Sequence, residues 1–401
     1  MSNPFPYQFL VNLAGETDKF PLPLYLKELL KKVDIPDFQK LEDFLLNEIQ
    51  NTSVQNQTSF DYFIFVVNES LPYFFTLQDS EKFEQLTTLI MHRIQAIRTA
   101  QIISFSFDAW EKFLDFKKVA FDRMVKKIPL EIFEKSIDKL DWTVFNSKFI
   151  SDLSTTIAYV YTLEETEEQV SRARLWLQKS ILESDFPTNL TNYFFQTSLM
   201  EKSNGGEISS SVERIRTAIT EGTEKLENAE IKRVFEMALI DLEGQWKVLT
   251  SQYQEDSEEN VQKAENSINE LNQSIGNLEE KYDLPEFCNS NIKLQLASLH
   301  FSKIYSSEEE TESPFFAKEV FSLADEAISL SEKINDNTAA AQAKLLRAQY
   351  SIALKQSLTE KEVKEIIQYY KKSTYYPGYI QANKVYADLL LHNDQPQKAS
   401  D

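Results

Sequence analysis

The chain has 401 residues, enough for a sizeable core and roughly two or three domains. Its 63 acidic and 42 basic residues give a formal net charge of −21. A nucleic acid or an anionic membrane surface would be repelled, so neither is expected as the main partner, although good solubility alone would also explain the charge. Seven glycines and twelve prolines are few turn residues for a large sheet, and composition therefore favours an all-α protein.

Residues 1–145 form a Phe- and Tyr-rich N-terminal region in which apolar residues recur at helical spacing. The stretch 60–77 carries β-favouring residues, yet we favour a helix there. A polar break at Asp79 and Ser80 is followed at once by clear helical spacing, with Ser80 as the expected N-cap. Together the pattern predicts helices at 22–30, 38–49, 60–77, 83–97, 106–124 and 130–140.

Residues 146–401 are predicted to form a second helical region. Gly205 and Gly206 lie in a polar stretch, so 201–207 is predicted to be either a hinge or an ordinary loop between helices. The segment 258–282 has a heptad-like apolar stripe of only about two and a half heptads, which favours a helical hairpin over a coiled coil. Further helices are predicted at 145–161, 166–182, 190–200, 212–226 and 230–253.

Three apolar-striped helices are predicted near the C-terminus, at 341–354, 361–371 and 378–391. If Ile380 is the first position of a repeat, Ala387 takes the small position of its first helix and Leu390 the next core position. Pro377 then closes the preceding repeat, and Ala399 takes the small position of the second helix. This layout resembles the tetratricopeptide repeat (TPR), a helix–turn–helix unit of about 34 residues.

The resemblance is carried mainly by residues 290–401. In the repeat before Ile380, Ala353 and Tyr369 fall on family positions, whereas Glu365 and Lys372 stand where small residues are expected. The resemblance implies an α-solenoid, a right-handed superhelix of antiparallel helix pairs that is TPR-like toward the C-terminus.

The sequence contains no recognisable catalytic signature. It has neither a Gly-rich phosphate loop nor a Gly-x-Ser-x-Gly elbow. His92, His300 and His392 are far apart and lack metal-binding spacing, and the single Cys288 has no cysteine partner. We therefore expect no catalytic residue, no metal, no cofactor and no enzyme, although a triad assembled from distant positions would leave no such signature.

One basic cluster, Arg123, Lys126 and Lys127, is a candidate anion patch. At helical spacing Arg123 and Lys127 would share a face, with Lys126 beside them. Glu111 and Asp115 are close in sequence, so the cluster is alternatively balanced surface charge.

The TPR resemblance also implies a binding face. Its frame puts Gln381, Lys384, Asp388 and His392 on the inner face of the last helix. Some members of the family clamp a peptide's terminal carboxylate there with Lys and Asn. Only Lys384 fits that pattern, and Asp388 would repel the carboxylate, so a bound peptide should be recognised through its side chains.

Nearby tyrosines give a second candidate contact surface. Tyr375 and Tyr379 belong to a tyrosine cluster that suits protein recognition, because tyrosine combines a large contact area with a polar tip. Core packing between consecutive repeats is the alternative for this cluster.

These observations favour a protein-interaction scaffold or adaptor that binds a protein or peptide partner. The alternative is a regulatory or sensor module that controls an effector enzyme, either associated or attached as a C-terminal domain missing from this chain. The start of the chain lacks the features of a secretory signal, and the most apolar stretch, 60–77, is too short and too broken to span a bilayer. We expect a soluble intracellular protein of the cytoplasm or nucleus.

Overall fold

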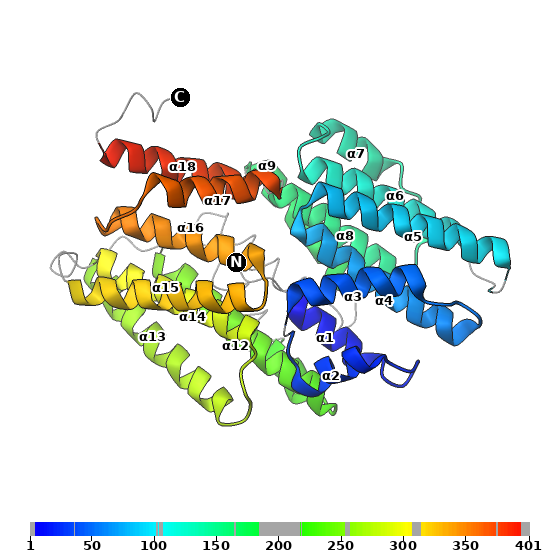
Figure 1. The fold of residues 1–401 in the computed structure, drawn as a ribbon, viewed down its shortest axis with the longest axis horizontal. Coiled ribbons are helices and arrows are strands. Elements are labelled where there is room, and N and C mark those ends of the chain that lie inside the picture. Colours follow the sequence, from blue (N-terminus) through cyan, green and yellow to red (C-terminus); the bar gives the residue numbers. More distant parts are fainter. Residues whose placement is uncertain are drawn as a thin grey trace.

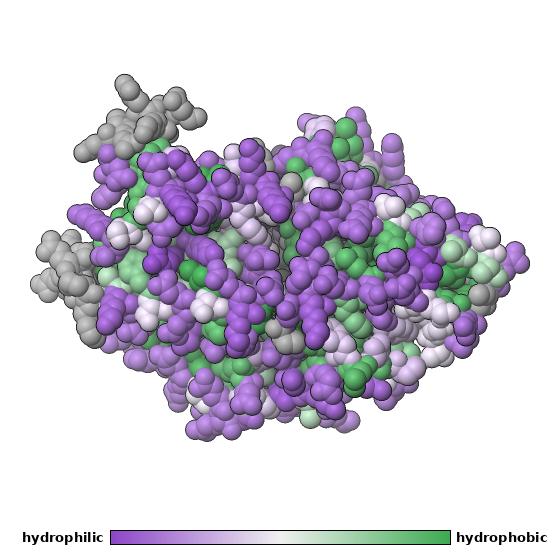
Figure 2. Space-filling model, viewed as in Figure 1, coloured by the Kyte–Doolittle hydropathy of each residue, from purple (hydrophilic) through white to green (hydrophobic). Residues whose placement is uncertain are grey.

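The structure is a computed structural model that describes residues 5–35, 37–101, 103, 107–163, 166–183, 217, 219–252, 257–306, 314–373 and 376–393. Within these ranges every regular element is a helix and no strand occurs, which confirms the all-α prediction (Figure 1). Hydrophilic side chains cover most of the face shown in Figure 2, as the large net charge leads one to expect.

The N-terminal half contains a series of helices that largely match the predicted ranges. Residues 57–77 form one helix with Pro72 inside it, which confirms the helix favoured there. The N-cap of the next helix is Asp79 and not Ser80, because the Asp79 carboxylate accepts hydrogen bonds from the N–H groups of Glu81 and Lys82. The helices are α1 (Phe5–Gly15), α2 (Leu24–Lys32), α3 (Phe38–Asn51), α4 (Gln57–Leu77), α5 (Ser80–Ala100), α6 (Phe107–Met124), α7 (Leu130–Asp138), the short 3₁₀ helix η1 (Trp142–Val144), α8 (Ser147–Thr162) and α9 (Glu167–Leu182).

The C-terminal half continues the helical series. The segment with the heptad-like stripe is α13, which packs against both α12 and α14, as expected for a helical hairpin. The predicted helix at 190–200 and the predicted hinge at 201–207 lie outside the described residues. The helices are α12 (Ala229–Gln252), α13 (Ser257–Glu279), α14 (Glu286–Ser306), α15 (Pro314–Lys333), α16 (Asn337–Ala353), α17 (Glu360–Lys372) and α18 (Tyr376–His392).

Helices α12 to α18 pack in a repeat-like way. Each helix packs against the next helix in the chain. Alternate helices are also in contact: α12 with α14, α14 with α16, and α16 with α18. This pattern divides the series into two layers, with α12, α14, α16 and α18 in one and α13, α15 and α17 in the other. Within this pattern α16 and α18 are direct neighbours in the first layer.

Helix α1 connects the two halves. It packs against α2 and α4 from its own half and against α12 from the other half (Figure 1). Its Tyr7 side chain is fully buried, and the Tyr7 hydroxyl donates a hydrogen bond of 3.0 Å to the buried carboxylate of Asp241 on α12. Asn291 on α14 donates to the same carboxylate at 3.2 Å. Three helices that are distant in sequence therefore meet at one buried acidic side chain.

Gln295 of α14 completes the polar contact around Asp241. Its Nε2 donates a hydrogen bond to the Asp241 side chain and another, of 3.0 Å, to the Asp241 carbonyl. Gly244 lies one turn further along α12 and lets Gln295 approach, because a side chain there would overlap the Gln295 amide. Burying a carboxylate is costly unless hydrogen bonds compensate, so this cluster fixes how α1, α12 and α14 fit together.

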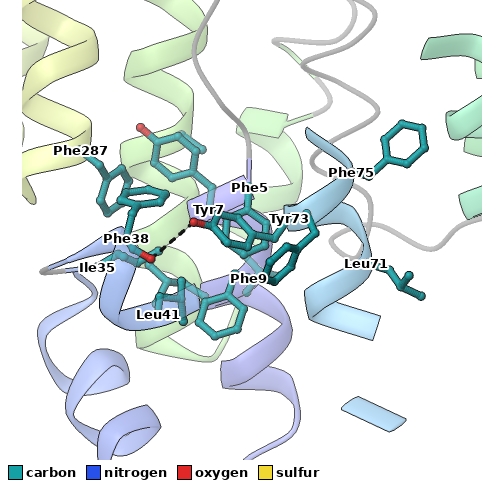
Figure 3. Close-up of a cluster of buried hydrophobic side chains, with 14 of the residues drawn as sticks. Phe5, Tyr7, Phe9, Ile35, Phe38, Leu41, Leu71, Tyr73, Phe75 and Phe287 are labelled. Carbon is teal, nitrogen blue, oxygen red and sulfur yellow. Dashed lines mark hydrogen bonds between the residues drawn. The ribbon is translucent and has the colours of Figure 1, made fainter. Parts of the chain in front are cut away.

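Aromatic packing extends the same junction, as Figure 3 shows. Ring centroids lie 5.3 Å apart for Tyr7 and Phe287 of α14, and 4.6 Å apart for Phe5 and Tyr73 of α4. The Tyr73 hydroxyl donates to the backbone carbonyl of Phe38 at 3.4 Å. Such edge and offset contacts add to the free energy gained from burying large apolar surfaces.

A second contact joins the start of α3 to the turn between α15 and α16. The N–H of Phe38 donates to the carbonyl of Ile334 at 2.7 Å, and the Asn335 side chain donates to the Asp37 carboxylate at 3.0 Å. Asn335 has a left-handed backbone with φ of 55°, a conformation that asparagine tolerates better than most residues. The turn that leads into α16 is thus held by the N-terminal half.

Two hydrophobic cores run through these helices. The larger is continuous from Phe5 to Leu354, and α6 packs against α8 across the predicted boundary at residue 145. The smaller is formed by α16, α17 and α18, around residues such as Ala341, Val363 and Val385. The last three helices therefore have a core of their own beside the main one.

We expect Gly244→Ala to lower the free energy of unfolding by about 1–3 kcal/mol. The added methyl would overlap the Gln295 amide, which cannot move away without losing its hydrogen bonds to Asp241. This loss should outweigh the gain of about 1 kcal/mol that alanine brings to a helix interior. Urea denaturation of the purified variant measures the change.

The matched control is Gly276→Ala on α13, where nothing lies within 4 Å of an added methyl group. There helix propensity alone should raise the free energy of unfolding by about 0.5–1 kcal/mol. Stabilisation by both substitutions would show that the contact between Gly244 and Gln295 does not constrain the packing of α12 on α14.

Candidate functional site

A cleft of about 360 Å³ lies between the C-terminal turns of α16 and the exposed side of α18. Concave sites of this size accommodate one or a few side chains of a ligand. The cleft combines apolar, amide and charged side chains. Its lining residues are Gln349, Ile352, Ala353, Gln381, Lys384, Val385 and Asp388.

Local sequence signals position the helices that form the cleft. Asp336 caps the N-terminus of α16 by accepting a hydrogen bond of 3.0 Å from the N–H of Ala339. Thr359 and Glu362 form a capping box at the start of α17. Lys355, in the turn after α16, has a left-handed backbone with φ of 52°, which turns the chain back toward α17. These caps and the smaller core hold α16 and α18 side by side.

The base and the walls of the cleft offer different chemistry. Val385 is buried and Ile352 is half-buried, so they provide an apolar base. Gln349 Nε2 donates a hydrogen bond of 3.3 Å to Gln381 Oε1, which joins the two helices across the cleft. Such amides can also donate to and accept from a peptide main chain.

The rim of the cleft carries one charge of each sign. Lys384 and Asp388 are both exposed and lie about one helical turn apart on α18. Neither has an ion-pair partner among the described residues. An incoming acidic group could therefore pair with Lys384, and an incoming basic group with Asp388, without first breaking an existing ion pair.

The structure brings three of the predicted inner-face residues together. Gln381, Lys384 and Asp388 all line the cleft. His392 is exposed at the end of α18 and is not among the lining residues. Tyr375 lies outside the described residues.

The described tyrosines near the cleft pack into the smaller core. Tyr370 is buried, and Tyr369 and Tyr379 pack against the core as partly buried residues. The Tyr369 hydroxyl lies 3.2 Å from the hydroxyl of Thr338 on α16. These contacts favour the core interpretation of the tyrosine cluster over a recognition surface for the part of the cluster that is described.

The sequence interpretation missed the half of the cleft that α16 contributes. Gln349, Ile352 and Ala353 are spaced i, i+3 and i+4, so they lie on one face of a helix that the sequence does predict. The repeat frame assigned an inner face to the last helix only. The equivalent positions about 34 residues earlier are Arg347, Tyr350 and Leu354, none of which lines the cleft, so the frame does not point to this surface.

The predicted anion patch does not form as expected. Helix α6 ends at Met124, and Lys126 has a left-handed backbone with φ of 60°, so the helical spacing between Arg123 and Lys127 is wrong. Arg123 is buried and donates to the carbonyl of Ile128 at 3.1 Å, while Lys127 lies 3.8 Å from the Asp122 carboxylate. Arg123 therefore stabilises the turn after α6.

The buried carboxyl group of Glu69 lies between α4 and α1, away from the cleft. Burial raises its pKa to about 8, opposed by Lys148 and by the hydrogen bond of 2.9 Å that the Asn12 amide donates. Glu16 and Asp152 raise its pKa further. A shifted pKa can indicate a catalytic acid, but no residue of the described cleft touches Glu69, so we assign it to packing.

The buried cluster at the junction of the two halves also contains titratable groups. Burial raises the pKa of the Cys288 thiol to about 12, with a smaller contribution from Asp241, so the thiol stays protonated near neutral pH. Burial likewise raises the pKa of the Tyr7 hydroxyl well above its usual value, which keeps it a hydrogen-bond donor to Asp241. Both groups serve packing in their neutral forms.

Across the described ranges no three His, Cys, Asp or Glu side chains gather as a metal-ion site would require. No helix in those ranges is both long enough and apolar enough to cross a membrane. A scan of the sequence against protein-family models finds no match, and a search of curated protein sequences finds none either.

We expect Glu69→Gln to stabilise the protein by about 3 kcal/mol at pH 7. The carboxyl pKa is about 8 in the folded protein and 4.5 as its ordinary value, so the folded state holds the proton more tightly. The contribution of Glu69 to stability is therefore fully present below pH 4.5 and is lost as the pH rises toward 8. Glutamine keeps the acceptor for Asn12 and does not ionise, so the advantage of the variant should grow over this pH range.

The control is Glu84→Gln on the exposed side of α5, which should change the free energy of unfolding by less than about 0.5 kcal/mol at any pH. Denaturant titrations of wild type and both variants across this pH range provide the comparison. If the free energy of unfolding depended on pH equally in wild type and Glu69→Gln, Glu69 would be ionised in the folded protein near neutral pH.

Proposed function

We propose that the protein is an interaction scaffold that binds an extended segment of a protein partner in the cleft between α16 and α18. The observation that carries this proposal is the composition of the cleft. It combines an apolar base, a pair of amides that joins its two walls, and two opposite charges at its rim that have no ion-pair partner among the described residues. Each of these features matches a part of a peptide.

The architecture supports the same proposal. We propose that α12 to α18 form a TPR-like right-handed superhelix, with the layer of α12, α14, α16 and α18 on its concave side. The alternating contacts between helices of this layer are what stacked helix–turn–helix units produce. Stacked repeats present extended binding surfaces for partners, and the cleft lies on one such surface.

The chemistry of the cleft defines the peptide that would fit. An apolar side chain would be buried against Ile352 and Val385, and the peptide main chain would exchange hydrogen bonds with the Gln349 and Gln381 amides. A flanking acidic residue would pair with Lys384. Asp388 lies about one helical turn from Lys384. Its carboxylate would attract a basic residue of the peptide and repel the peptide's terminal carboxylate.

The test begins with selection of binders to the whole chain from a random-peptide display library. We expect Lys384→Glu to weaken binding of the selected peptides at least tenfold, about 1.4 kcal/mol, because it replaces an attractive pair by a repulsive one. Peptides selected against the variant should carry a basic residue where those selected against wild type carry an acidic one. Fluorescence polarisation measures the affinities.

The matched control is Lys361→Glu on α17, in the other layer. Lys361 has an 86% exposed side chain, and the variant has the same net charge as Lys384→Glu. It should leave peptide affinity unchanged within about twofold. Equal losses in the two variants would show that overall charge governs binding, and unchanged binding in Lys384→Glu would exclude the cleft as the site.

A further inference from the structure

Helix α18 exposes an apolar stripe beside the cleft. Ile380 is 40% exposed and Leu391 is 54% exposed, although both are large hydrophobic residues. They lie about three full turns apart and so project from the same side of the helix, with the small Ala387 between them. The buried residues of α18, including Ala382 and Leu389, lie on the opposite side.

Two charges lie along the same stripe. Lys384 and Asp388 are exposed and stand between Ile380 and Leu391 in the sequence. Neither forms an ion pair within the described part of the chain. Along α18 the stripe therefore reads apolar, positive, negative, apolar.

When a second α18 helix runs in the opposite direction, each charge of the stripe faces the opposite charge and each apolar end faces an apolar end. In an antiparallel pair of α18 helices related by a two-fold axis near Tyr386, Lys384 of one copy faces the partner's Asp388. Ile380 faces the region of the partner's Leu391, and the same contacts are repeated on the other side of the axis. Ala387 lies close to the axis, where a small side chain lets the helices approach to the usual distance of about 8–10 Å.

We propose that two copies of this chain associate through their α18 helices, packed antiparallel around these four positions. Charge complementarity is the reason to favour a second copy over another occupant, because the two reciprocal ion pairs and the two reciprocal apolar contacts form from one surface. The surface lies next to the proposed peptide cleft and shares Lys384 and Asp388 with it, while Ile380 and Leu391 are outside the cleft lining.

The association should be weak and dependent on concentration. A single pair of helices buries less than the roughly 1,600 Å² of a standard interface. The net charge of −21 on each chain also opposes association at low salt. At about 0.15 M salt the screening length is about 8 Å, which reduces the long-range repulsion more than the contacts at the helix crossing.

Sedimentation equilibrium of the whole chain at about 0.15 M salt tests the proposal, from roughly 1 to 200 µM protein. The expected result is a mass that rises from monomer toward dimer over this range. Ile380→Glu and Leu391→Glu should each keep the protein monomeric. Because both side chains are exposed, the fold should survive, which circular dichroism checks.

A charge-swap series provides a second measurement. Lys384→Asp should weaken dimerisation at least tenfold, and so should Asp388→Lys, because each creates two repulsive pairs across the axis. The double variant Lys384→Asp/Asp388→Lys should restore the wild-type dimerisation constant, since it restores both pairs with reversed polarity. Failure of the double variant to recover dimerisation would overturn the proposed helix pairing.

Two further outcomes would also overturn the proposal: a wild-type chain that stays monomeric at the highest concentration, and a dimer that persists in Ile380→Glu. The peptide-binding proposal is tested independently of the proposed dimer. Ile380→Ser removes the apolar side chain, keeps every residue of the cleft lining and adds no charge beside Lys384, so its affinity for the selected peptides reports on the cleft alone.

Discussion

A buried carboxylate has to receive hydrogen bonds from within the protein, and in this chain Asp241 receives them from helices that are far apart in sequence. Tyr7 of α1 and Asn291 of α14 both donate to it, and Gln295 donates to its side chain and its carbonyl. Loss of one donor would leave part of the free-energy cost of burying the Asp241 carboxylate uncompensated. The N-terminal helix is therefore an integral part of the C-terminal helix array.

The position of the cleft depends on this junction through a chain of contacts. Asp241 fixes α14 against α12, and α14 packs in turn on α15 and α16. Helices α14 and α15 approach closely at small residues. There the Ser290 hydroxyl of α14 donates a hydrogen bond of 3.0 Å to the Ala327 carbonyl of α15. The contact between Phe38 and Ile334 then holds the turn that leads into α16. The wall of the cleft that α16 provides is thus anchored to the N-terminal half.

The other wall of the cleft depends on fewer contacts. Helix α18 packs on α17 and α16 through the smaller core, which contains residues such as Tyr370 and Leu389. Its other side carries the exposed stripe and the rim charges. Among the described helices α18 packs mainly on α16 and α17, so a ligand in the cleft or a second copy on the stripe would add contacts to its other side. The proposed peptide site and the proposed contact between two copies both lie on this side of α18.

Sequence patterns predicted most of the helices in which one face is apolar and the other polar, although the range of α14 was not among them. The helix α4 was predicted despite its β-favouring residues, because the polar break at Asp79 and Ser80 and the helical spacing that follows it favoured a helix. Helix α1 was missed because most of its residues are buried, including Tyr7 and Leu10, so its polar face is too narrow to show a clear period.

The candidate site was predicted in part for a similar reason. The repeat frame identified Gln381, Lys384 and Asp388 because these polar residues stand on one face of a predicted helix. It could not show that Gln349 of α16 would lie across from them, because the distance between two helices depends on tertiary packing. The anion patch failed because a left-handed residue, Lys126, ends the helical spacing just after α6, and nothing in its type signals that turn.

Hydrogen exchange of the whole chain, with and without a selected peptide, tests the central claim most directly. Binding in the cleft predicts slower exchange in the last turns of α16, which carry Gln349 and Ile352, and along α18, with α13 and α15 unchanged. Protection confined to the N-terminal helices, or none in α16 and α18 at saturating peptide, would contradict the claim. In that case the cleft would be a surface feature without a binding role.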